Sequence, residues 1–392
     1  MTNALRVAMI GHGFMGAAHS QGWRVAPRFF DLPLAPEMTV LVGRDPEAAA
    51  AAAQRWGWEE SASDWRAVLD RDDIDVVDIV TPGDTHAEIA VAALAAGKHV
   101  LCEKPLANSV AEAEGMAVAA EAAAARGIRS MVGFTYRRVP AATFARDLVA
   151  AGRLGEIRQV RAAYRQDWLS DAEAPLTWRL QKDRAGSGSL GDIGAHAIDL
   201  AEFITGLSLE TVSGVLDTVV PERPLLGEGV GLSGTASAER GVVTVDDIAL
   251  FAGRFSGGDG YRALGSFEAT RFATGRKNGF TIEVSGALGA LAFNLERQNE
   301  LEFYDATDPA GEQGFRTILV TDPVHPYAGS WWPTGHMLGY EHGFSHQVVD
   351  FVAAVAEGTA PRPSFAEGLH VQRVLDAVER SAGDGSSWTA VG

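Results

Sequence analysis

The first third of the chain alternates short apolar runs with alanine-rich stretches. The apolar runs lie at residues 5–10, 38–42, 76–80, 99–102 and 130–134. The stretches between them, at residues 46–56, 86–96 and 110–126, are rich in residues that favour helices. Short buried strands separated by helices predict a parallel β-sheet that is covered on both faces. This part of the chain therefore predicts an α/β domain.

After about residue 150, strand-like segments follow one another with few helical stretches between them. The predicted strands lie at residues 157–165, 211–220, 241–255, 260–270, 281–285, 291–294, 301–304 and 315–320, with a glycine-rich turn at 257–260. Helices are predicted at residues 192–205, 343–357 and 365–381. This pattern predicts an α+β domain with a large, mostly antiparallel, open-faced sheet. We place the boundary near residues 135–145, which gives one domain over 1–137 and another over 138–392.

A glycine-rich loop follows the first predicted strand. Gly11, Gly13 and Gly16 form the pattern G-x-G-x-x-G, and a helix is predicted directly after it. In Rossmann dinucleotide-binding domains, these glycines allow a tight turn, close approach of a pyrophosphate and close packing of helix on strand. The free N–H groups at the helix start then bind phosphate. The alternative is a purely structural turn, but the position between strand and helix favours a Rossmann domain over residues 1–137.

The end of the second predicted strand bears on the choice between NAD and NADP. An acidic residue at this place binds the ribose 2′-hydroxyl of NAD. This chain has Gly43 there, followed by Arg44 and Asp45. Arg44 can receive a 2′-phosphate, which favours NADP, whereas Asp45 can either turn toward the ribose or cap the next helix. Both cofactors stay open.

Two further strand ends carry polar residues. Thr81 and Pro82 end the third predicted strand, and Glu103, Lys104 and Pro105 end the fourth. Open α/β sheets bind ligands at the carboxyl ends of their strands. A lysine there can meet the nicotinamide, although most lysines are solvated surface residues. The position directly after a buried strand favours the functional interpretation.

A second group of polar residues begins the helix predicted at 192–205. Asp192 and His196 are four residues apart, so both side chains fall on one helix face. A carboxylate there can orient an imidazole or share a substrate hydroxyl with it. The alternative is a helix-capping aspartate and a core histidine.

These motifs together resemble those of the glucose–fructose oxidoreductase/inositol dehydrogenase (Gfo/Idh/MocA) family. The family pattern is the glycine loop, T-P-x-x-x-H, E-K-P and D-x-x-x-H, which this chain shows in order at Gly11–Gly16, Thr81–His86, Glu103–Pro105 and Asp192–His196. The family often has Asn where this chain has Gly83. Segments at 136–138, 166–168, 175–179 and 325–327 also resemble a narrower branch, the levoglucosan dehydrogenases.

The resemblance implies oxidation of a secondary hydroxyl of a sugar, anhydrosugar or cyclic polyol, or the reverse reduction. Hydride would pass to C4 of the nicotinamide of NAD or NADP. The catalytic residues would be Lys104, which stabilises the developing alkoxide, Asp192, which orients its neighbour or binds a hydroxyl, and His196, which accepts the proton.

The resemblance also implies the two sets of binding residues. The expected cofactor-binding residues are Gly11, Gly13, Phe14, Met15, Gly16, Arg44, Thr81, Pro82, His86, Glu103, Lys104, Trp178 and Arg179. The expected substrate-binding residues are Lys104, Tyr136, Gln166, Trp168, Asp192 and His196.

Two alternative functions fit the same fold. One is an NAD-dependent glycoside-cleaving or epimerising enzyme that oxidises its sugar transiently. The other is a non-catalytic regulator that senses the cofactor. The presence of Lys104, Asp192 and His196 together argues against the regulator, which needs no proton acceptor.

Composition excludes other classes of function. The 33 basic and 51 acidic residues give a formal charge of −18, which disfavours binding to nucleic acid or anionic membranes. With one cysteine and no apparent secretory signal, we expect a cytoplasmic protein. The family resemblance implies a small-molecule carbohydrate or polyol substrate. The family resemblance implies a homodimer or homotetramer. We expect no metal: His336, His342 and His346 lie near one another in sequence but do not form a full H-E-x-x-H motif.

Overall fold

The computed structural model describes residues 4–230, 233–257 and 262–392. The chain divides into two compact units. Unit 1 consists of residues 1–138 and 339–372, and unit 2 consists of residues 139–338 and 373–392. The sequence pattern predicted a single boundary, with one domain over 1–137 and another over 138–392. The units of the structure differ from this because residues 339–372 return to unit 1.

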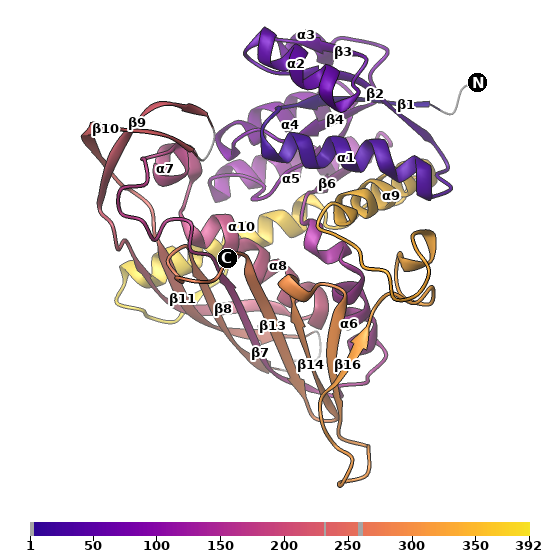
Figure 1. Ribbon diagram of the computed structural model, residues 1–392, viewed down its shortest axis with the longest axis vertical. Helices are drawn as coiled ribbons and strands as arrows, with labels where there is room; N and C mark the ends of the chain where they lie inside the picture. The colour runs from indigo at the N-terminus through magenta and orange to yellow at the C-terminus, as the bar shows by residue number, and fades with distance from the viewer. Residues whose placement is uncertain (1–3, 231–232, 258–261) are drawn as a thin grey trace. The chain divides into compact units, whose positions relative to one another are not determined.

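Unit 1 is built on a six-stranded parallel sheet with the strand order β3-β2-β1-β4-β5-β6 (Figure 1). Its strands are β1 (Ala4–Ile10), β2 (Ala35–Val42), β3 (Glu60–Ala62), β4 (Val76–Ile79), β5 (His99–Cys102) and β6 (Ser130–Val132). This confirms the predicted parallel α/β fold. The sequence did not predict β3, because its three residues are polar or small and leave no apolar run.

The helices of unit 1 include the three predicted alanine-rich stretches, here at residues 46–56, 86–95 and 110–124, and a five-residue helix at 65–69 that the sequence pattern did not predict. They are α1 (Phe14–Phe29), α2 (Pro46–Trp56), α3 (Trp65–Leu69), α4 (His86–Ala95), α5 (Val110–Ala124) and α9 (His342–Glu357), with short 3₁₀ turns η1 (Gly83–Thr85) and η2 (Thr135–Arg138). The α10 helix (Phe365–Gly383) begins in unit 1 and ends in unit 2.

The return of α9 to unit 1 has a packing reason. Figure 1 shows α9 beside α1, and Val348, Phe351 and Val352 join the same buried cluster as Trp23 and Ala26. The rings of Trp23 and Phe351 meet edge to face, with centroids 6.4 Å apart. The apolar side of α9 predicts that this side of the helix is buried. The sequence pattern does not predict which element it packs against.

Unit 2 contains a nine-stranded sheet with the order β16-β15-β14-β13-β7-β12-β11-β8-β17, and a separate pair β9-β10. Within the nine-stranded sheet, β7 pairs parallel with β12, and the other pairs run antiparallel. The strands are β7 (Ile157–Arg165), β8 (Ser208–Asp217), β9 (Glu222–Val230), β10 (Ser233–Val242), β11 (Ile248–Ser256), β12 (Arg262–Thr270), β13 (Gly279–Gly286), β14 (Gly289–Asn294), β15 (Glu300–Asp305), β16 (Arg316–Leu319) and β17 (Thr389–Ala390). The mostly antiparallel sheet was predicted.

Two strand predictions need correction or restriction. The single strand expected at 241–255 is wrong, because β10 ends at Val242 and β11 begins at Ile248. Asp246 and Asp247 lie in the break, where their buried carboxyl groups accept backbone hydrogen bonds instead of continuing a strand. The glycine-rich turn at 257–260 and the first two residues of the strand expected at 260–270 fall largely outside the described residues.

Helices cover one face of the large sheet and leave the other open. The helical segments of unit 2 are α6 (Pro140–Ala150), η3 (Trp178–Leu180), α7 (Lys182–Ala185), the π-helical turn η4 (Leu190–Gly194), α8 (Ala195–Thr205), η5 (Leu295–Arg297) and η6 (Ala328–Ser330). The α8 helix packs on β7, β12 and β13. Because successive strand residues face opposite sides, Tyr164 faces α8 and Arg161 and Arg165 face away.

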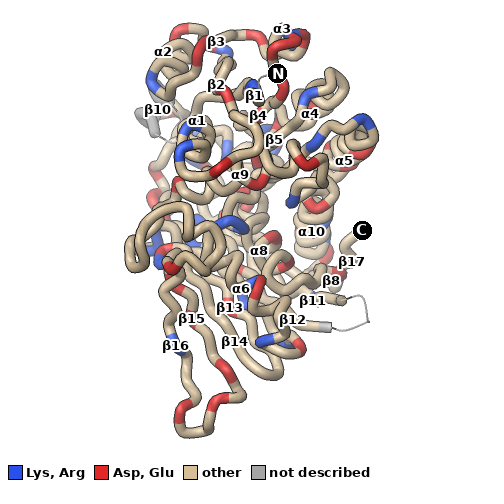
Figure 2. The backbone as a smooth tube through the Cα atoms, turned by 90° about the vertical axis from the view of Figure 1, so that its right-hand side faces the viewer, with Lys and Arg blue, Asp and Glu red and all other residues tan. Residues whose placement is uncertain are grey.

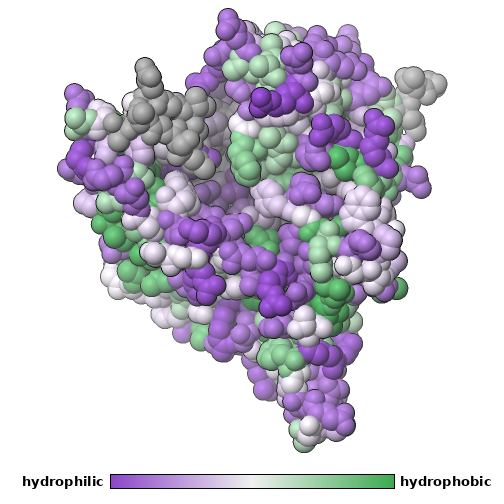
Figure 3. All heavy atoms as spheres, viewed as in Figure 1, coloured by the Kyte–Doolittle hydropathy of each residue, from purple (hydrophilic) through white to green (hydrophobic). Residues whose placement is uncertain are grey.

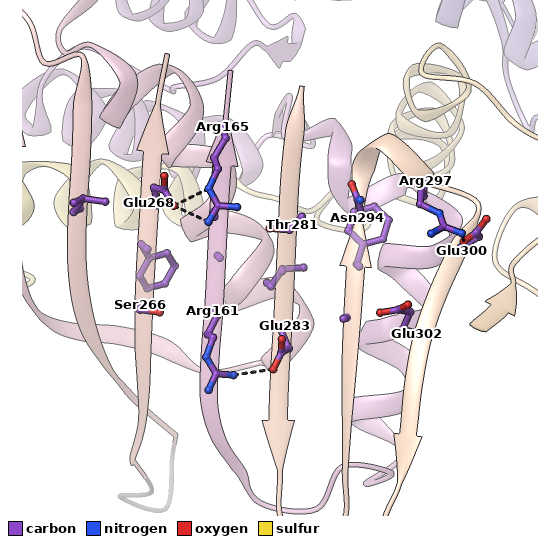
Figure 4. A pocket seen from close by; sticks show the side chains of 17 residues that line it. Arg161, Arg165, Ser266, Glu268, Thr281, Glu283, Asn294, Arg297, Glu300 and Glu302 are labelled. Atoms are coloured by element: carbon purple, nitrogen blue, oxygen red, sulfur yellow. Dashed lines mark hydrogen bonds and ion pairs between the residues drawn. The ribbon is translucent and has the colours of Figure 1, made fainter. Parts of the chain in front are cut away.

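The open face holds a hollow of about 600 Å³. In Figure 4, Arg161 points toward Glu283 and Arg165 toward Glu268, and both ion pairs are formed. None of the expected site residues lines this hollow. The expected chemistry therefore lies outside this hollow.

The surface and the helices bear on membrane and nucleic-acid binding. Figure 2 shows acidic and basic residues interspersed along the backbone of both units, and the face drawn in Figure 3 mixes hydrophilic with apolar residues. Among the described residues, no helix is both long enough and apolar enough to cross a membrane.

Candidate active site

The loop between β1 and α1 requires glycine at two positions and leaves space at the third. Gly11 has a φ of +115°, and a Cβ there would lie 2.9 Å from the Val80 carbonyl oxygen. A Cβ on Gly16 would lie 2.9 Å from the Gly11 carbonyl oxygen. A Cβ on Gly13, the N-cap of α1, would meet nothing within 4 Å. The loop therefore exposes the start of α1, and Phe14 beside it is 67% exposed.

The neighbouring residue Met15 packs differently from Phe14. Met15 is partly buried against the core of unit 1. It therefore holds the first turn of α1 on the sheet, while Phe14 projects outward.

At the end of β2, the structure resolves the alternative for Asp45. Its carboxylate accepts hydrogen bonds from the backbone N–H groups of Glu47 (3.0 Å) and Ala48 (3.1 Å), so it caps α2. A Cβ at Gly43 would lie 2.2 Å from Cδ2 of His12. The place where an acidic residue would bind the ribose is thus filled by the His12 ring, and Arg44 beside it is exposed.

His86 joins the ends of β4 and β5. Its ring nitrogens lie 3.0 Å from the Pro105 carbonyl oxygen and 2.9 Å from the Thr81 carbonyl oxygen. The side chain is buried. Pro82 follows Thr81 and is the N-cap of η1. His86 therefore braces the two loops that carry the T-P and E-K-P motifs.

A buried charged cluster, which the sequence analysis missed, lies behind the E-K-P motif. His19 of α1 places Nδ1 2.9 Å from Asp78 of β4 and Nε2 3.0 Å from Glu103 after β5. Trp23 Nε1 also donates to Asp78, at 2.7 Å. Burial opposes a charge on His19, but the two carboxylates outweigh it and raise the pKa of His19 to about 10.

Glu103 connects this cluster to Lys104. The backbone N–H of Lys104 donates to Glu103 Oε2 at 3.1 Å. The charged cluster thus fixes the backbone from which the lysine side chain extends. The signals available in the sequence were a histidine three residues after the last glycine of the motif and an aspartate inside an apolar strand.

A further residue that the sequence analysis missed is Tyr340, which comes to unit 1 with the segment before α9. Its ring stacks on Phe14, with centroids 6.2 Å apart. Burial raises the pKa of Tyr340, and the neighbouring Tyr136 and Glu103 raise it further. Tyr340 and the buried Tyr136 therefore lie close to the glycine loop and to the end of β5.

In unit 2, polar side chains are linked in a row at the end of β7. Trp168 Nε1 donates to Gln166 Oε1 at 3.0 Å, and Gln166 Nε2 donates to Asn278 Oδ1 at 2.8 Å. The hydroxyl of Tyr164 donates to the same Asn278 oxygen at 2.7 Å. The Tyr164 ring lies 6.0 Å from the ring of His196, measured between centroids. Two expected substrate residues are thus linked through Asn278 to Tyr164, whose ring lies beside that of the expected proton acceptor.

The segment before Asp192 is anchored by Asp246, which the sequence analysis did not identify. The buried carboxylate of Asp246 accepts hydrogen bonds from Gly188 N (2.7 Å), Ser189 Oγ (2.7 Å) and Leu190 N (2.8 Å). A Cβ on Gly188 would lie 1.7 Å from the Asp246 carbonyl oxygen, so only glycine fits. These bonds fix the start of the π-helical turn. Such turns are frequent at functional sites.

Asp192 lies in that turn and pairs with a buried arginine. Arg271 Nη2 donates to Asp192 Oδ2 at 2.8 Å, and the Arg271 side chain is 1% exposed. Arg179 stacks on Trp178, with its guanidinium carbon 4.3 Å from the ring centroid. Burial lowers the pKa of Arg179, although the charge of Asp192 opposes this. Asp192 therefore has two arginines in its surroundings.

The three histidines near α9 have other partners. His346 is buried, its Nδ1 lies 2.8 Å from the Arg138 carbonyl oxygen, and burial lowers its pKa to about 3. His342 Nδ1 accepts from Gly339 N, and His336 Nδ1 lies 2.8 Å from the Pro333 carbonyl oxygen. Over the described part of the chain, no group of three or more His, Cys, Asp or Glu side chains is arranged to hold a metal ion.

Within each unit, the structure brings most expected residues together. Unit 1 contains the glycine loop, the motifs at the strand ends and Tyr136. The expected residues in unit 2 are Gln166, Trp168, Trp178, Arg179, Asp192 and His196. Arg44 lies apart from the E-K-P group, beyond the end of β2.

Comparison with known proteins gives consistent relatives. Residues 5–134 match the model of the oxidoreductase family with an NAD-binding Rossmann fold, and residues 143–292 match the C-terminal domain of the same family. The chain is 44% identical to levoglucosan dehydrogenase of Pseudarthrobacter phenanthrenivorans, over 99% of this chain and 98% of that protein. It is 26% identical to inositol 2-dehydrogenase of Rhizobium meliloti, over 97% of each chain.

Solved structures agree with these relatives. An oxidoreductase domain protein from Kribbella flavida matches with a TM-score of 0.94 and 61% identity, over all of both chains. A levoglucosan dehydrogenase in complex with NADH and L-sorbose matches with a TM-score of 0.92 and 44% identity, also over all of both chains. The chain is therefore an oxidoreductase with an NAD-binding Rossmann domain, and it belongs to the Gfo/Idh/MocA family.

Proposed function

We propose that this protein oxidises a secondary hydroxyl of a sugar or anhydrosugar, with levoglucosan as the first candidate. The observation that carries the proposal is the linked group in unit 2, where Trp168 and Gln166 are hydrogen-bonded through Asn278 to Tyr164, and the Tyr164 ring lies beside His196. An indole and an amide beside an imidazole suit a ring with several hydroxyls. The 44% identity to a levoglucosan dehydrogenase over almost the whole chain supports the same substrate class.

The residues of unit 1 fit a dinucleotide. Gly11 and Gly16 allow a tight turn, and Gly13 leaves open space at the start of α1 for a pyrophosphate. We propose that the cofactor contacts are Gly11, Gly13, Phe14, Met15, Gly16, Arg44, Thr81, Pro82, Lys104, Trp178 and Arg179. We propose that His86 and Glu103 support the cofactor site without contacting the cofactor. Both side chains are buried and bound to other protein groups.

The end of β2 supports use of NADP as well as NAD. Asp45 is engaged in capping α2, His12 fills the space at Gly43, and Arg44 is exposed. A carboxylate that faced the ribose would repel a 2′-phosphate. Gly43 has no carboxylate, and the carboxylate of Asp45 is bound to the start of α2.

The chemistry divides between the cofactor and the chain. When bound, the nicotinamide accepts the hydride. We propose that His196 accepts the hydroxyl proton at a ring nitrogen, because an imidazole titrates near neutral pH. The ammonium group of Lys104 stabilises the developing negative charge on the substrate oxygen. Asp192 accepts a hydrogen bond from a neighbouring hydroxyl, and Tyr136, Gln166 and Trp168 hold the ring.

A spectrophotometric assay tests the proposal. The purified protein is incubated with NAD or NADP and with levoglucosan, myo-inositol, glucose or xylose, and the absorbance of the reduced nicotinamide is followed. We expect growth with levoglucosan. Growth with none of the sugars, in a protein that binds the nucleotide, would overturn the proposal. Cleavage of a glycoside without net reduction of the cofactor would then indicate transient oxidation, and neither reaction would indicate the regulator.

A further inference from the structure

We propose that Arg271 is a positioning residue of the active site, which holds the carboxylate of Asp192 ionised and oriented so that His196 is left as the proton acceptor. This inference rests on the proposed function. Arg271 follows β12 directly and has no counterpart among the sequence motifs.

The first argument is the cost of burying Arg271. Its side chain is 1% exposed, and a buried guanidinium is stable only when it is paired. Asp192 supplies the carboxylate, with Nη2 and Oδ2 2.8 Å apart. Because each partner favours the charged form of the other, the pair keeps Asp192 ionised.

The second argument is the geometry of the guanidinium. Nη2 also lies 3.3 Å from the Gly188 carbonyl oxygen, and the guanidinium carbon lies 5.2 Å from the centroid of the Trp168 ring. Arg271 thus contacts the turn that carries Asp192 and the end of the row Trp168–Gln166. A planar, fixed fork suits this task better than a lysine, which offers a mobile point charge.

The third argument is the separation of roles between Asp192 and His196. An ionised carboxylate that is already bound to a cation is a poor proton acceptor but a good hydrogen-bond acceptor. The imidazole of His196, on the next turn of the chain, is then the group that gains the proton. The arginine also offsets the negative charge that Asp192 would otherwise present to that imidazole.

The test measures the pKa of His196 directly, without substrate. Histidine is labelled with ¹³C, and the His196 signal is assigned among the ten histidines by its loss in His196→Asn. Arg271→Met removes a positive charge next to Asp192, which favours the imidazolium, so we expect the pKa of His196 to rise by roughly half a unit or more. Asp192→Asn should lower it, and the double variant should lie between the two.

The other titratable or charged groups on α8, on the elements packed against it and beside the turn of Asp192 are unchanged in these variants. They are Asp199 and Glu202 on α8, Arg146 on α6, Tyr164 on β7, Asp246 before β11 and Arg179 in η3. They contribute equally to the wild type and to each variant, so differences report on the Arg271–Asp192 pair.

Arg223→Met is the matched control. Arg223 is also a fully buried arginine of unit 2, but its guanidinium donates to the carbonyl oxygens of Leu169, Asp171 and Ala174. Its loss should lower stability and leave the pKa of His196 unchanged. The same rise in Arg223→Met, or no rise in a folded Arg271→Met, would overturn the inference.

Two further measurements complete the test. Arg271→Lys keeps the charge, so the pKa of His196 should stay near the wild-type value while kcat falls about tenfold through lost orientation. If Arg271→Met does not fold, two variants still test the inference: Asp192→Asn should lower the pKa of His196, and Arg271→Lys should leave it near the wild-type value. An unchanged pKa in Asp192→Asn, or unchanged kcat in Arg271→Lys, would overturn it. An absence of sugar oxidation would count against the proposed function alone, because the titration needs no turnover.

Discussion

At the scale of single residues, buried charged side chains lie beside the residues expected to form the active site. His19 is enclosed by Asp78 and Glu103, and Arg271 is enclosed with Asp192 as its carboxylate partner. A buried ion is costly unless its partners satisfy it. Such groups are therefore retained where their geometry matters, and both clusters adjoin expected active-site residues.

The first residue-scale prediction concerns Lys104 and His196. Lys104→Met and His196→Ala should each lower kcat by about 100-fold or more, because each removes help to charge or proton transfer in the transition state. Binding of NADH, followed by its fluorescence, should survive. Lys182→Met is the control, since this exposed lysine forms a surface pair with Glu379 that is worth little. Near-normal kcat in both active-site variants would reject the assignments.

The second residue-scale prediction concerns His19 and alkaline pH. Its pKa is about 10 in the folded chain and about 6.5 when unfolded, so the folded state holds the extra proton between these values. The stabilisation is complete below about pH 6.5 and is lost as the pH rises through about 10. The free energy of unfolding should fall by up to about 1.4 kcal/mol per pH unit in this window.

Denaturant unfolding between pH 6.5 and 9.5 measures this slope. A flat profile for the wild type would contradict the assignment of a charged His19. Where His19→Asn folds, its profile should lose the slope, since asparagine does not titrate.

At the scale of elements, the active-site turn depends on a loop that the sequence pattern predicted as part of one continuous strand. The break between β10 and β11 supplies Asp246, which fixes the start of η4 through three hydrogen bonds. Arg223 of β9 acts similarly on the loop at 169–174, through three backbone carbonyl groups. Both supports come from the region that the sequence analysis predicted least well.

The element-scale prediction is a pair of glycine substitutions. Gly188→Ala should lower kcat and the melting temperature, because its Cβ would collide with the Asp246 backbone and displace the turn that carries Asp192. Gly115→Ala is the matched control: it lies exposed inside α5, and a Cβ there meets nothing within 4 Å. Helix propensity should make this variant more stable by about 1 kcal/mol. Equal melting temperatures for both variants would contradict the role of the close approach.

At the scale of the whole molecule, no helix in the described part of the chain covers the open face of the large sheet. Val215, Leu250 and Leu264 are about half exposed there, beside the ion pair of Arg165 with Glu268. An apolar patch that adjoins a charged hollow is typical of an interaction surface.

The prediction at this scale is that the chain forms a homodimer or homotetramer through this face. Light scattering coupled to size-exclusion chromatography should give a multiple of 41.5 kDa. Leu250→Glu should shift the distribution toward the monomer by burying a charge in the contact. Val118→Glu, on the exposed side of α5, should leave the distribution unchanged. A wild-type monomer would contradict the prediction.

The sequence alone determined the local features. Apolar runs gave the strands of the parallel sheet, and G-x-G-x-x-G, E-K-P and D-x-x-x-H located the expected chemistry, because turn geometry and side-chain periodicity are fixed by neighbouring residues. Only the tertiary structure decided which distant residues meet. Arg271 against Asp192, Asp246 against Gly188, and α9 against α1 depend on burial between segments far apart in the chain. A local pattern marks a residue for burial, but the partner that satisfies its charge or fills its space is set by the fold.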